Sequence, residues 1–365
     1  MSQPAFRNSR RFYSMIGMEK QTYYTLLHID QPQVVEAYLR ERAWLELGES
    51  VQQLSPAGEG NMNLTLRVAT DLRTFIVKQS RPWVEKYPSI PAPEDRVLME
   101  AEFYQAVSHF GEIAERMPRL LGCDEQNFVA LFEDLGGTAD FTDLYNDGLA
   151  SFAPLHRLCQ WLAALHGAEF DLETRQRLEN IEMRKLNHEH LYCYPLRHDN
   201  GFDLDAITPG LAAVAAELKG DAAYLSAIAE LGERYLENGP SLLHGDFYPG
   251  SWVSYTARQG EASSDNIWVI DPEFCFFGPA EFDLGILIGH LLLSGRSPTL
   301  FDEVFAGYRG AASFNRELAL RFAGMEIMRR LIGVAQLPLI ADLAQKEALL
   351  ATSRELLLRP ESFFR

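Results

Sequence analysis

The stretch LLHGDFYPGSWV (residues 242–253), followed after a polar segment by NIWVIDPEFCFFGPAEFDLG (residues 266–285), decides the fold. It contains two acidic clusters, each preceded by a short apolar run: Asp246 follows the first run, and Asp271 and Glu273 follow the second. Two such runs joined by a polar, glycine-containing turn predict a β-hairpin. The hairpin would bring together carboxylates that are 25 positions apart in the sequence.

These side chains suit phosphoryl transfer from a metal–nucleotide complex. Asp246 can accept the proton of an attacking hydroxyl, and Ser251, five positions later, offers an oxygen to a divalent ion. Asp271 and Glu273 are two residues apart, so an extended backbone would point both to the same side. Mg²⁺ prefers such oxygen ligands together with substrate phosphates, as in the kinase arrangement. The alternative is a hairpin whose acids only line solvent.

A second set of kinase-like signals lies nearer the amino terminus. Alternating apolar residues over 62–68 predict a strand, residues 74–79 predict another, and a glycine-containing turn precedes both. In a kinase, Gly58 and Gly60 would let backbone N–H groups approach phosphates, and Lys78 would hold the α- and β-phosphates. The Gly58-x-Gly60 pattern by itself is more typical of an ordinary hairpin turn.

Lys78 needs an acidic partner if it acts as a kinase lysine. Residues 95–107 predict a helix whose Glu100 could form the orienting ion pair. Glu102 competes for that role, and Glu100 could equally be a solvated helix carboxylate. The proline-rich residues 81–95 predict a loop over the cleft.

The motifs HGDxxxGS and IDPEFxFxGPxxFDxG resemble those of the methylthioribose kinase branch of the aminoglycoside phosphotransferase/choline kinase superfamily. The usual forms in that family are HGDLHTGS, DPEFAFYGP and FDIG or FDVG. The resemblance implies that Asp246 is the catalytic base and that Asp271 and Glu273 bind the metal. Most of the superfamily has Asn where Ser251 stands. The Phe247–Tyr248–Pro249 departure lies beside the base and leaves the acceptor open.

The resemblance extends over residues 25–340 and implies further site residues. GEGNMN resembles the family's GDGNLN, which adds Asn61 to the loop and makes Asn63 a nucleotide contact. The segment MRRLIG resembles the family's CELIRRxIG, where an arginine contacts the sugar. The nucleotide hinge and the substrate arginines implied in this way are Glu133, Asp134, Leu135, Arg329 and Arg330. Without the resemblance, adjacent helix arginines are more often solvent-facing.

Composition limits the function classes. The 365-residue chain has a net charge of −18, which argues against a nucleic-acid surface. Four dispersed cysteines without a CxxC pair favour a reduced, cytoplasmic protein. No apolar run reaches the roughly 18 residues of a membrane span. Residues 1–24 predict a loose N-terminal extension.

The sequence therefore predicts an α+β, protein-kinase-like fold of two lobes. Residues 25–132 would form the nucleotide-binding N-lobe and residues 133–365 the helical C-lobe, with helices expected over 32–47 and 321–337. ATP and Mg²⁺ are the expected cofactors, and 5-methylthioribose is the expected acceptor. The alternatives are a kinase of another sugar, choline or an aminoglycoside, and a nucleotide-binding pseudokinase. By resemblance, the expected assembly is a homodimer.

Overall fold

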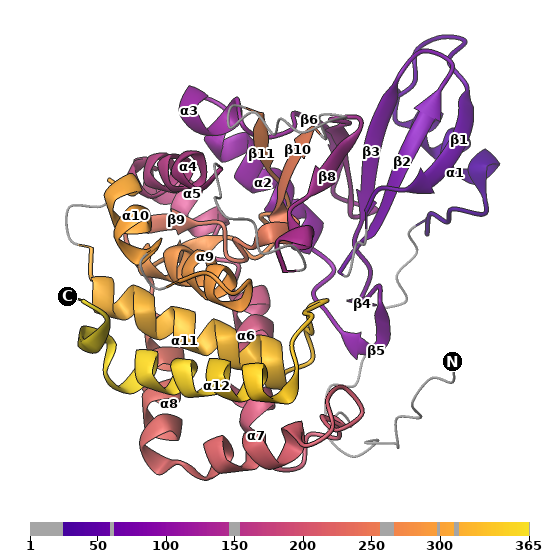
Figure 1. The fold of residues 1–365 in the computed structure, drawn as a ribbon. Helices are drawn as coiled ribbons and strands as arrows, with labels where there is room; N and C mark the ends of the chain where they lie inside the picture. Colours follow the sequence, from indigo (N-terminus) through magenta and orange to yellow (C-terminus); the bar gives the residue numbers. More distant parts are fainter. Residues whose placement is uncertain are drawn as a thin grey trace.

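The computed structural model describes residues 25–58, 62–145, 154–255, 266–297, 300–309 and 314–364; the expected extension 1–24 lies outside them. A strand-rich part, whose main sheet comes from residues 51–133, stands beside a larger helical part (Figure 1). This arrangement confirms the predicted two-lobed α+β class. Among the helices in these ranges, none combines the length and the apolar composition that a transmembrane span requires.

The strand-rich part is built on one five-stranded antiparallel sheet with the order β1-β2-β3-β7-β6. Three smaller strand groupings accompany it. In chain order the strands are β1 (Val51–Pro56), β2 (Leu64–Thr70), β3 (Thr74–Gln79), β4 (Trp83–Val84), β5 (Tyr87–Pro91), β6 (Leu120–Asp124), β7 (Val129–Glu133), β8 (Thr138–Asp140), β9 (Ser241–Leu243), β10 (Trp252–Tyr255), β11 (Ile267–Val269) and β12 (Phe276–Gly278).

The alternation of side chains along these strands gives the five-stranded sheet two different faces. Leu66 and Val77 pack with helix α1 (Pro32–Glu41) on one face. Ala130 and Phe132 belong to the core that includes helix α2 (Arg96–Val107) on the other face. Lys78 lies directly opposite Ala130 in the β3–β7 register, so it points to the α2 face. The expected strand over 74–79 therefore places its lysine toward α2.

The helical part surrounds a fully buried helix, α9 (Glu281–Leu293), which packs closely on α11 (Arg316–Ile332). A Cβ atom at Gly285 would lie 2.4 Å from the Phe322 Cβ, so glycine permits this approach. The helices are α1 (Pro32–Glu41), α2 (Arg96–Val107), α3 (Gly111–Ala114), α4 (Leu155–Gly167), α5 (Leu172–Arg177), α6 (Ile181–His188), α7 (Leu211–Gly220), α8 (Ala222–Leu236), α9 (Glu281–Leu293), α10 (Leu300–Gly307), α11 (Arg316–Ile332) and α12 (Leu343–Leu358).

The predicted hairpin is confirmed as the antiparallel pair β10–β11, in which Trp252 lies opposite Val269. A second pair, β9–β12, places Leu243 opposite Phe276. The two pairs share the same stretch of chain: β9 precedes the Asp246 loop, and β11 precedes Asp271. The acidic clusters are therefore brought together by two sets of strand hydrogen bonds.

Three expected elements have different limits in the structure. The helix expected over 32–47 ends at Glu41, because the backbone at Ala43 is left-handed (φ +57°) and Leu47 is fully exposed. The helix expected over 321–337 begins at Arg316, where the Asn315 side chain accepts the Leu318 N–H, and ends before Gly333. The segment 81–95 is not a simple loop but contains the β4–β5 hairpin.

Candidate active site

The loop that follows β9 presents Asp246. Gly245 has a positive φ of 87°, and a Cβ there would lie 2.0 Å from the Phe274 backbone oxygen, so only glycine fits. The buried Asp283 carboxylate accepts the backbone N–H groups of His244 (2.7 Å) and Gly245 (3.0 Å). Asp283 at the start of α9 thus fixes the loop.

His244 connects the two acidic clusters. Because a carbonyl can only accept, its Nε2–H donates to the Ile270 oxygen (2.9 Å), and Nδ1 accepts the Asp246 N–H (3.3 Å). Burial lowers the pKa of His244, which favours this neutral ring. His166 is buried, and its Nε2 lies 3.1 Å from the Asp283 carboxylate.

The Asp246 cluster consists of Asp246, Glu326, Arg329 and Arg330. The Asp246 Oδ1 lies 3.0 Å from Arg329 Nη2 and 3.4 Å from Arg330 Nη2. Glu326 accepts the Nε–H of each arginine, at 2.5 Å and 2.8 Å. Both arginines are buried and face the predicted base, so the solvent-facing alternative is wrong.

Ser251 lies beneath the same loop. It is buried, and its hydroxyl donates to the backbone oxygen of Asp246 at 3.0 Å. Its predicted role as a metal ligand would use the oxygen lone pairs left after this donation.

The Lys78 cluster consists of Asn63, Lys78, Glu100, Asp271 and Glu273. The Lys78 Nζ lies 2.7 Å from Glu100 Oε1 and also forms an ion pair with Asp271. Glu100 is buried on α2, which removes the solvated-carboxylate alternative. The cluster joins strands β2 and β3 and helix α2 to the segment that follows β11.

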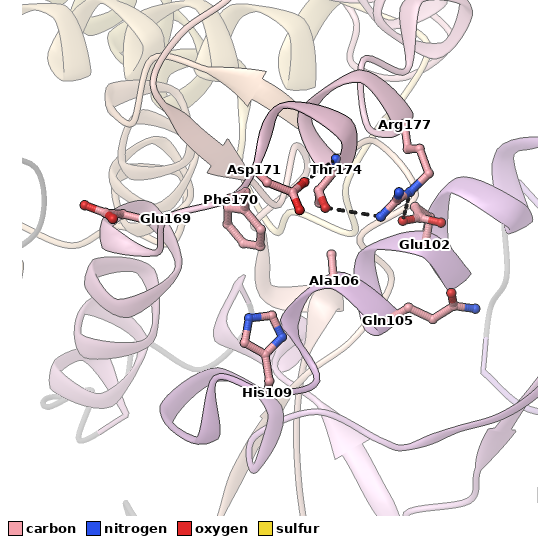
Figure 2. Close-up of a pocket in the computed structure, with 9 residues that line it drawn as sticks. All are labelled: Glu102, Gln105, Ala106, His109, Glu169, Phe170, Asp171, Thr174 and Arg177. Atoms are coloured by element: carbon pink, nitrogen blue, oxygen red, sulfur yellow. Dashed lines mark hydrogen bonds and ion pairs between the residues drawn. The ribbon is translucent and has the colours of Figure 1, made fainter.

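Glu102, the competing partner, points elsewhere. Figure 2 shows it paired with Arg177 of α5, with a Glu102 Oε1 to Arg177 Nε distance of 2.7 Å. The two residues line a cavity of about 420 Å³ between α2 and α5. Positions 100 and 102 are about 200° apart around a helix, so only one of them can face Lys78.

The segment from Asp271 to Glu273 is not extended, contrary to the expectation. Asp271 has a left-handed backbone (φ +63°), and a turn begins at Glu273. The Asp271 side chain is 42% exposed, whereas Glu273 is buried and accepts from Asn63 Nδ2 at 2.8 Å. Burial raises the pKa of Glu273 to about 7, against the lowering effect of the Arg96 guanidinium.

Asn180 holds this segment in place from the helical part. Its Nδ2 donates to the backbone oxygens of Glu273 and Cys275, each at 2.9 Å. Asn180 itself has a left-handed backbone (φ +47°) at the start of α6 and is buried. The geometry of the Glu273 turn therefore depends on a residue more than 90 positions earlier.

The Lys78 cluster contains side-chain oxygens that suit Mg²⁺ and an ammonium group, Lys78 Nζ, that suits phosphate. Asn63 Oδ1 and Glu100 Oε2 are buried and have no hydrogen-bond partner in the part of the chain that the structure describes. Within the same residues, no three His, Cys, Asp or Glu side chains are grouped as a metal site by themselves. Magnesium usually takes one or two carboxylates and completes its coordination with phosphates and water, so these residues fit it.

The remaining predicted nucleotide residues lie where strands of the five-stranded sheet end: Gly58 follows β1, and residues 133–135 lie at the end of β7. Glu133 and Asp134 have side-chain partners, Arg119 and Arg67, so an adenine contact by residues 133–135 would use the main chain, Leu135 included. Gly58 has a φ of 94° and open space around it. Gly60 and Asn61 lie outside the described residues.

The sequence interpretation missed four buried polar residues that shape the site: Asp283, Glu326, Asn180 and Arg96. Asp283 stood inside the quoted FDLG motif without a role. Glu326 precedes Arg329 and Arg330 by three and four positions, which places all three on one face of a helix. The spacing of three and four positions could therefore have indicated from the sequence that Glu326 pairs with the two arginines. The sequence around Asn180 and Arg96 gives no comparable indication.

Comparison with known sequences agrees with this geometry. The sequence model described as "Phosphotransferase enzyme family" matches residues 53–320. Methylthioribose kinase from Bacillus cereus (strain AH820) is 24% identical, over 92% of this chain and 91% of the relative. Methylthioribose kinase from Bacillus thuringiensis (strain Al Hakam) gives the same values.

Solved structures share the fold at lower identity. LicA in complex with AMP has a TM-score of 0.51 at 13% identity, covering 89% of this chain and 99% of that chain. The AMP-bound spectinomycin phosphotransferase APH(9)-Ia also has a TM-score of 0.51 at 13% identity, covering 90% and 98%. At these identities the likeness concerns the fold alone, and it supports the predicted kinase-like class.

Proposed function

The chain belongs to the phosphotransferase enzyme family and is an ATP-dependent phosphotransferase with an alcohol acceptor, and from that premise we propose that it phosphorylates 5-methylthioribose. The acceptor would be the anomeric hydroxyl, and the product 5-methylthioribose 1-phosphate would enter methionine salvage. The observation that supports this proposal is the Asp246 carboxylate held against two buried arginines. The full-length similarity to methylthioribose kinases supports the choice of sugar.

In this proposal Asp246 orients and deprotonates the attacking hydroxyl. Arg329 Nη1 has no hydrogen-bond partner among the described residues, so it can donate to a sugar hydroxyl. The three nitrogens of Arg330 contact Glu326, Asp246 and, at 3.5 Å, the Ala335 oxygen. Arg329 is therefore the better candidate for direct substrate contact, and Arg330 supports it.

The nucleotide would bind at the Lys78 cluster. Lys78, fixed by Glu100, would hold the α- and β-phosphates, and Asn63 and residues 133–135 would contact the rest of the nucleotide. Asp271, Glu273 and Ser251 would hold Mg²⁺, which neutralises phosphate charge when it is bound. Lys78 would then exchange its Asp271 partner for phosphate oxygens.

A kinase of a different small acceptor is the second candidate, and one residue favours it. Of the three departures beside the base, Phe247 is buried and stacks on Trp161, so it is a packing change. Tyr248 instead covers the guanidinium of Arg330, with a distance of 4.8 Å to the ring centroid. A tyrosine here changes the wall of the acceptor pocket.

Three further expectations belong to this proposal. They are the division into lobes at residues 132 and 133, a cytoplasmic location, and a homodimeric assembly. The first would place the break where β7 ends and the chain leaves the five-stranded sheet. The other two rest on cysteine usage and on the family resemblance.

The test is Mg-ATP turnover by the purified protein with 5-methylthioribose, beside ribose, choline and kanamycin, with ADP release as the readout. Saturable turnover with methylthioribose that disappears in Asp246→Ala would support the proposal. Activity with another acceptor alone would refute the substrate and favour the second candidate. Mg-ATP binding without ADP formation from any acceptor would favour a nucleotide-binding pseudokinase.

A further inference from the structure

Glu326 is a fully buried carboxylate at the centre of the Asp246 cluster, and no predicted role accounts for it. Three donors converge on its two oxygens. Arg329 Nε lies 2.5 Å from Oε2, and Arg330 Nε and His290 Nε2 each lie 2.8 Å from Oε1. Glu326 therefore bonds the same nitrogen, Nε, of both arginines that contact the predicted base.

The hydrogen bonds behind Glu326 have a defined direction. The two guanidinium groups hold the pKa of Glu326 well below its usual range despite its burial, so it is ionised and can only accept. Burial lowers the pKa of His290 to about 4, so its ring is neutral and donates through Nε2–H. The other ring nitrogen, Nδ1, must then accept the Tyr145 hydroxyl at 2.6 Å. Tyr145, His290 and Glu326 thus form one chain of hydrogen bonds.

This chain fixes the arginines at a second point. A guanidinium bonded only through Nη2 can swing about that contact, whereas one bonded through both Nε and Nη2 has a set plane. The cluster is also balanced in charge, because two carboxylates, Asp246 and Glu326, face two guanidinium groups, Arg329 and Arg330. Without Glu326, two buried cations would face the single carboxylate of Asp246.

We propose that Glu326, supported by His290 and Tyr145, is a positioning residue that sets the planes of Arg329 and Arg330 against Asp246. The inference rests on the proposed phosphorylation of a sugar-like alcohol and adds a residue to its acceptor side. Glu326 does not touch the substrate in this account. It acts by holding the Nη1 of Arg329 toward the acceptor. Its negative charge also balances one of the two arginines, so that Asp246 does not face both cations alone.

A purely structural role for Glu326 is the competing explanation, because α9 and α11 pack against each other at this residue: a Cβ at Gly289 would lie 3.0 Å from the Glu326 Cβ. The two explanations differ in which kinetic parameter changes. Loss of packing lowers the amount of folded enzyme and weakens the binding of every ligand. Loss of positioning lowers kcat for the acceptor and leaves nucleotide binding intact, because the nucleotide residues lie in the Lys78 cluster.

The first experiment compares Glu326→Gln with the matched control Glu317→Gln, an exposed acid on the same helix. The glutamine keeps the shape but turns an N–H₂ donor toward an arginine or histidine donor. We expect kcat to fall roughly 10- to 150-fold, the loss typical of a charged hydrogen bond. The Kd of Mg-ADP should stay within about twofold, and the control should match the wild type.

Two outcomes would overturn the inference. One is a kcat within about twofold of the wild type in Glu326→Gln. The other is a joint loss of kcat and Mg-ADP affinity in proportion to the folded fraction. If Glu326→Gln does not fold, Glu326→Asp replaces it, since it keeps the charge but shortens the reach to the Nε atoms. The inference then requires that Glu326→Asp lowers kcat while the Kd of Mg-ADP stays unchanged.

A readout without turnover separates this inference from the proposed function. In protein labelled with ¹⁵N-arginine, the Nε–H signals of Arg329 and Arg330, assigned with Arg329→Lys and Arg330→Lys, should exchange slowly with solvent. Both should change in Glu326→Gln and persist in Glu317→Gln. An enzyme inactive on methylthioribose that keeps this pattern refutes only the proposed substrate. Fast exchange of both signals in the wild type refutes the positioning role.

Discussion

The two charged clusters of the site are completed in different ways. The Lys78 cluster joins β2, β3 and α2 to the segment after β11, and it contains buried oxygens on Asn63 and Glu100 that have no partner among the described residues. The Asp246 cluster comes only from the helical part, and Glu326 already bonds both of its arginines. The first cluster is suited to be completed by a ligand, whereas the second is assembled by the protein.

The largest expected effect follows from removing the base of the assembled cluster. In Asp246→Asn, the side chain keeps its shape but loses the proton acceptor, so kcat should fall by about 10²–10⁴-fold. Mg-ADP binding, measured by calorimetry, should change little because the Lys78 cluster is intact. Turnover close to that of the wild type would exclude Asp246 as the base.

An intermediate effect should distinguish the two carboxylates of α2. Glu100→Gln removes a buried partner of Lys78, and a hydrogen bond to a charged group contributes about 1.5–3 kcal/mol. We expect kcat/KM for ATP to fall roughly 10- to 150-fold. Glu102→Gln is the matched control, because its pair with Arg177 is partly exposed and such pairs contribute at most about 1 kcal/mol.

The control also shows how this comparison could fail. Equal losses of kcat/KM in the two variants would mean that the position of α2, not the Lys78–Glu100 contact, determines nucleotide use. The Arg177 contact in Figure 2 would then have to be reconsidered as a support for α2.

The last predicted effect is on stability instead of turnover: the stability of the protein without ligands should depend on pH. The folded state binds the Glu273 proton more tightly than the unfolded chain, since burial raises this pKa from 4.5 to about 7. The free energy of unfolding should therefore fall as the pH rises through this interval, by up to about 1.4 kcal/mol per pH unit. Above pH 7 this contribution levels off.

Denaturant titrations of the wild type and Glu273→Gln between pH 4.5 and 8 measure this effect. The difference between the two proteins isolates Glu273 from other groups that titrate, because glutamine does not ionise. Parallel plots of unfolding free energy against pH for the two proteins would show that Glu273 is ionised in the folded state. The Lys78 cluster would then not need a bound cation to ionise Glu273.

Local patterns predicted the elements on which the site is built. The alternation over residues 62–68 predicted strand β2, residues 74–79 predicted strand β3 with Lys78, and the polar turn predicted the β10–β11 hairpin. These predictions succeeded because side-chain period and turn composition act over a few residues. The expected extended backbone at Asp271 failed for the opposite reason. Its left-handed conformation is held by distant contacts from Lys78 and, through the Glu273 turn, from Asn180.

The sequence by itself therefore determined the class of fold, the two strands that lead to and carry Lys78, and the acidic residues grouped near Asp246 and Asp271. Only the tertiary structure decided which partners they have: Glu100 and not Glu102 for Lys78, and buried rather than exposed arginines for Asp246. The physical reason is that charge pairing between elements depends on which helix face is buried against which loop. That choice is made by the packing of the whole core.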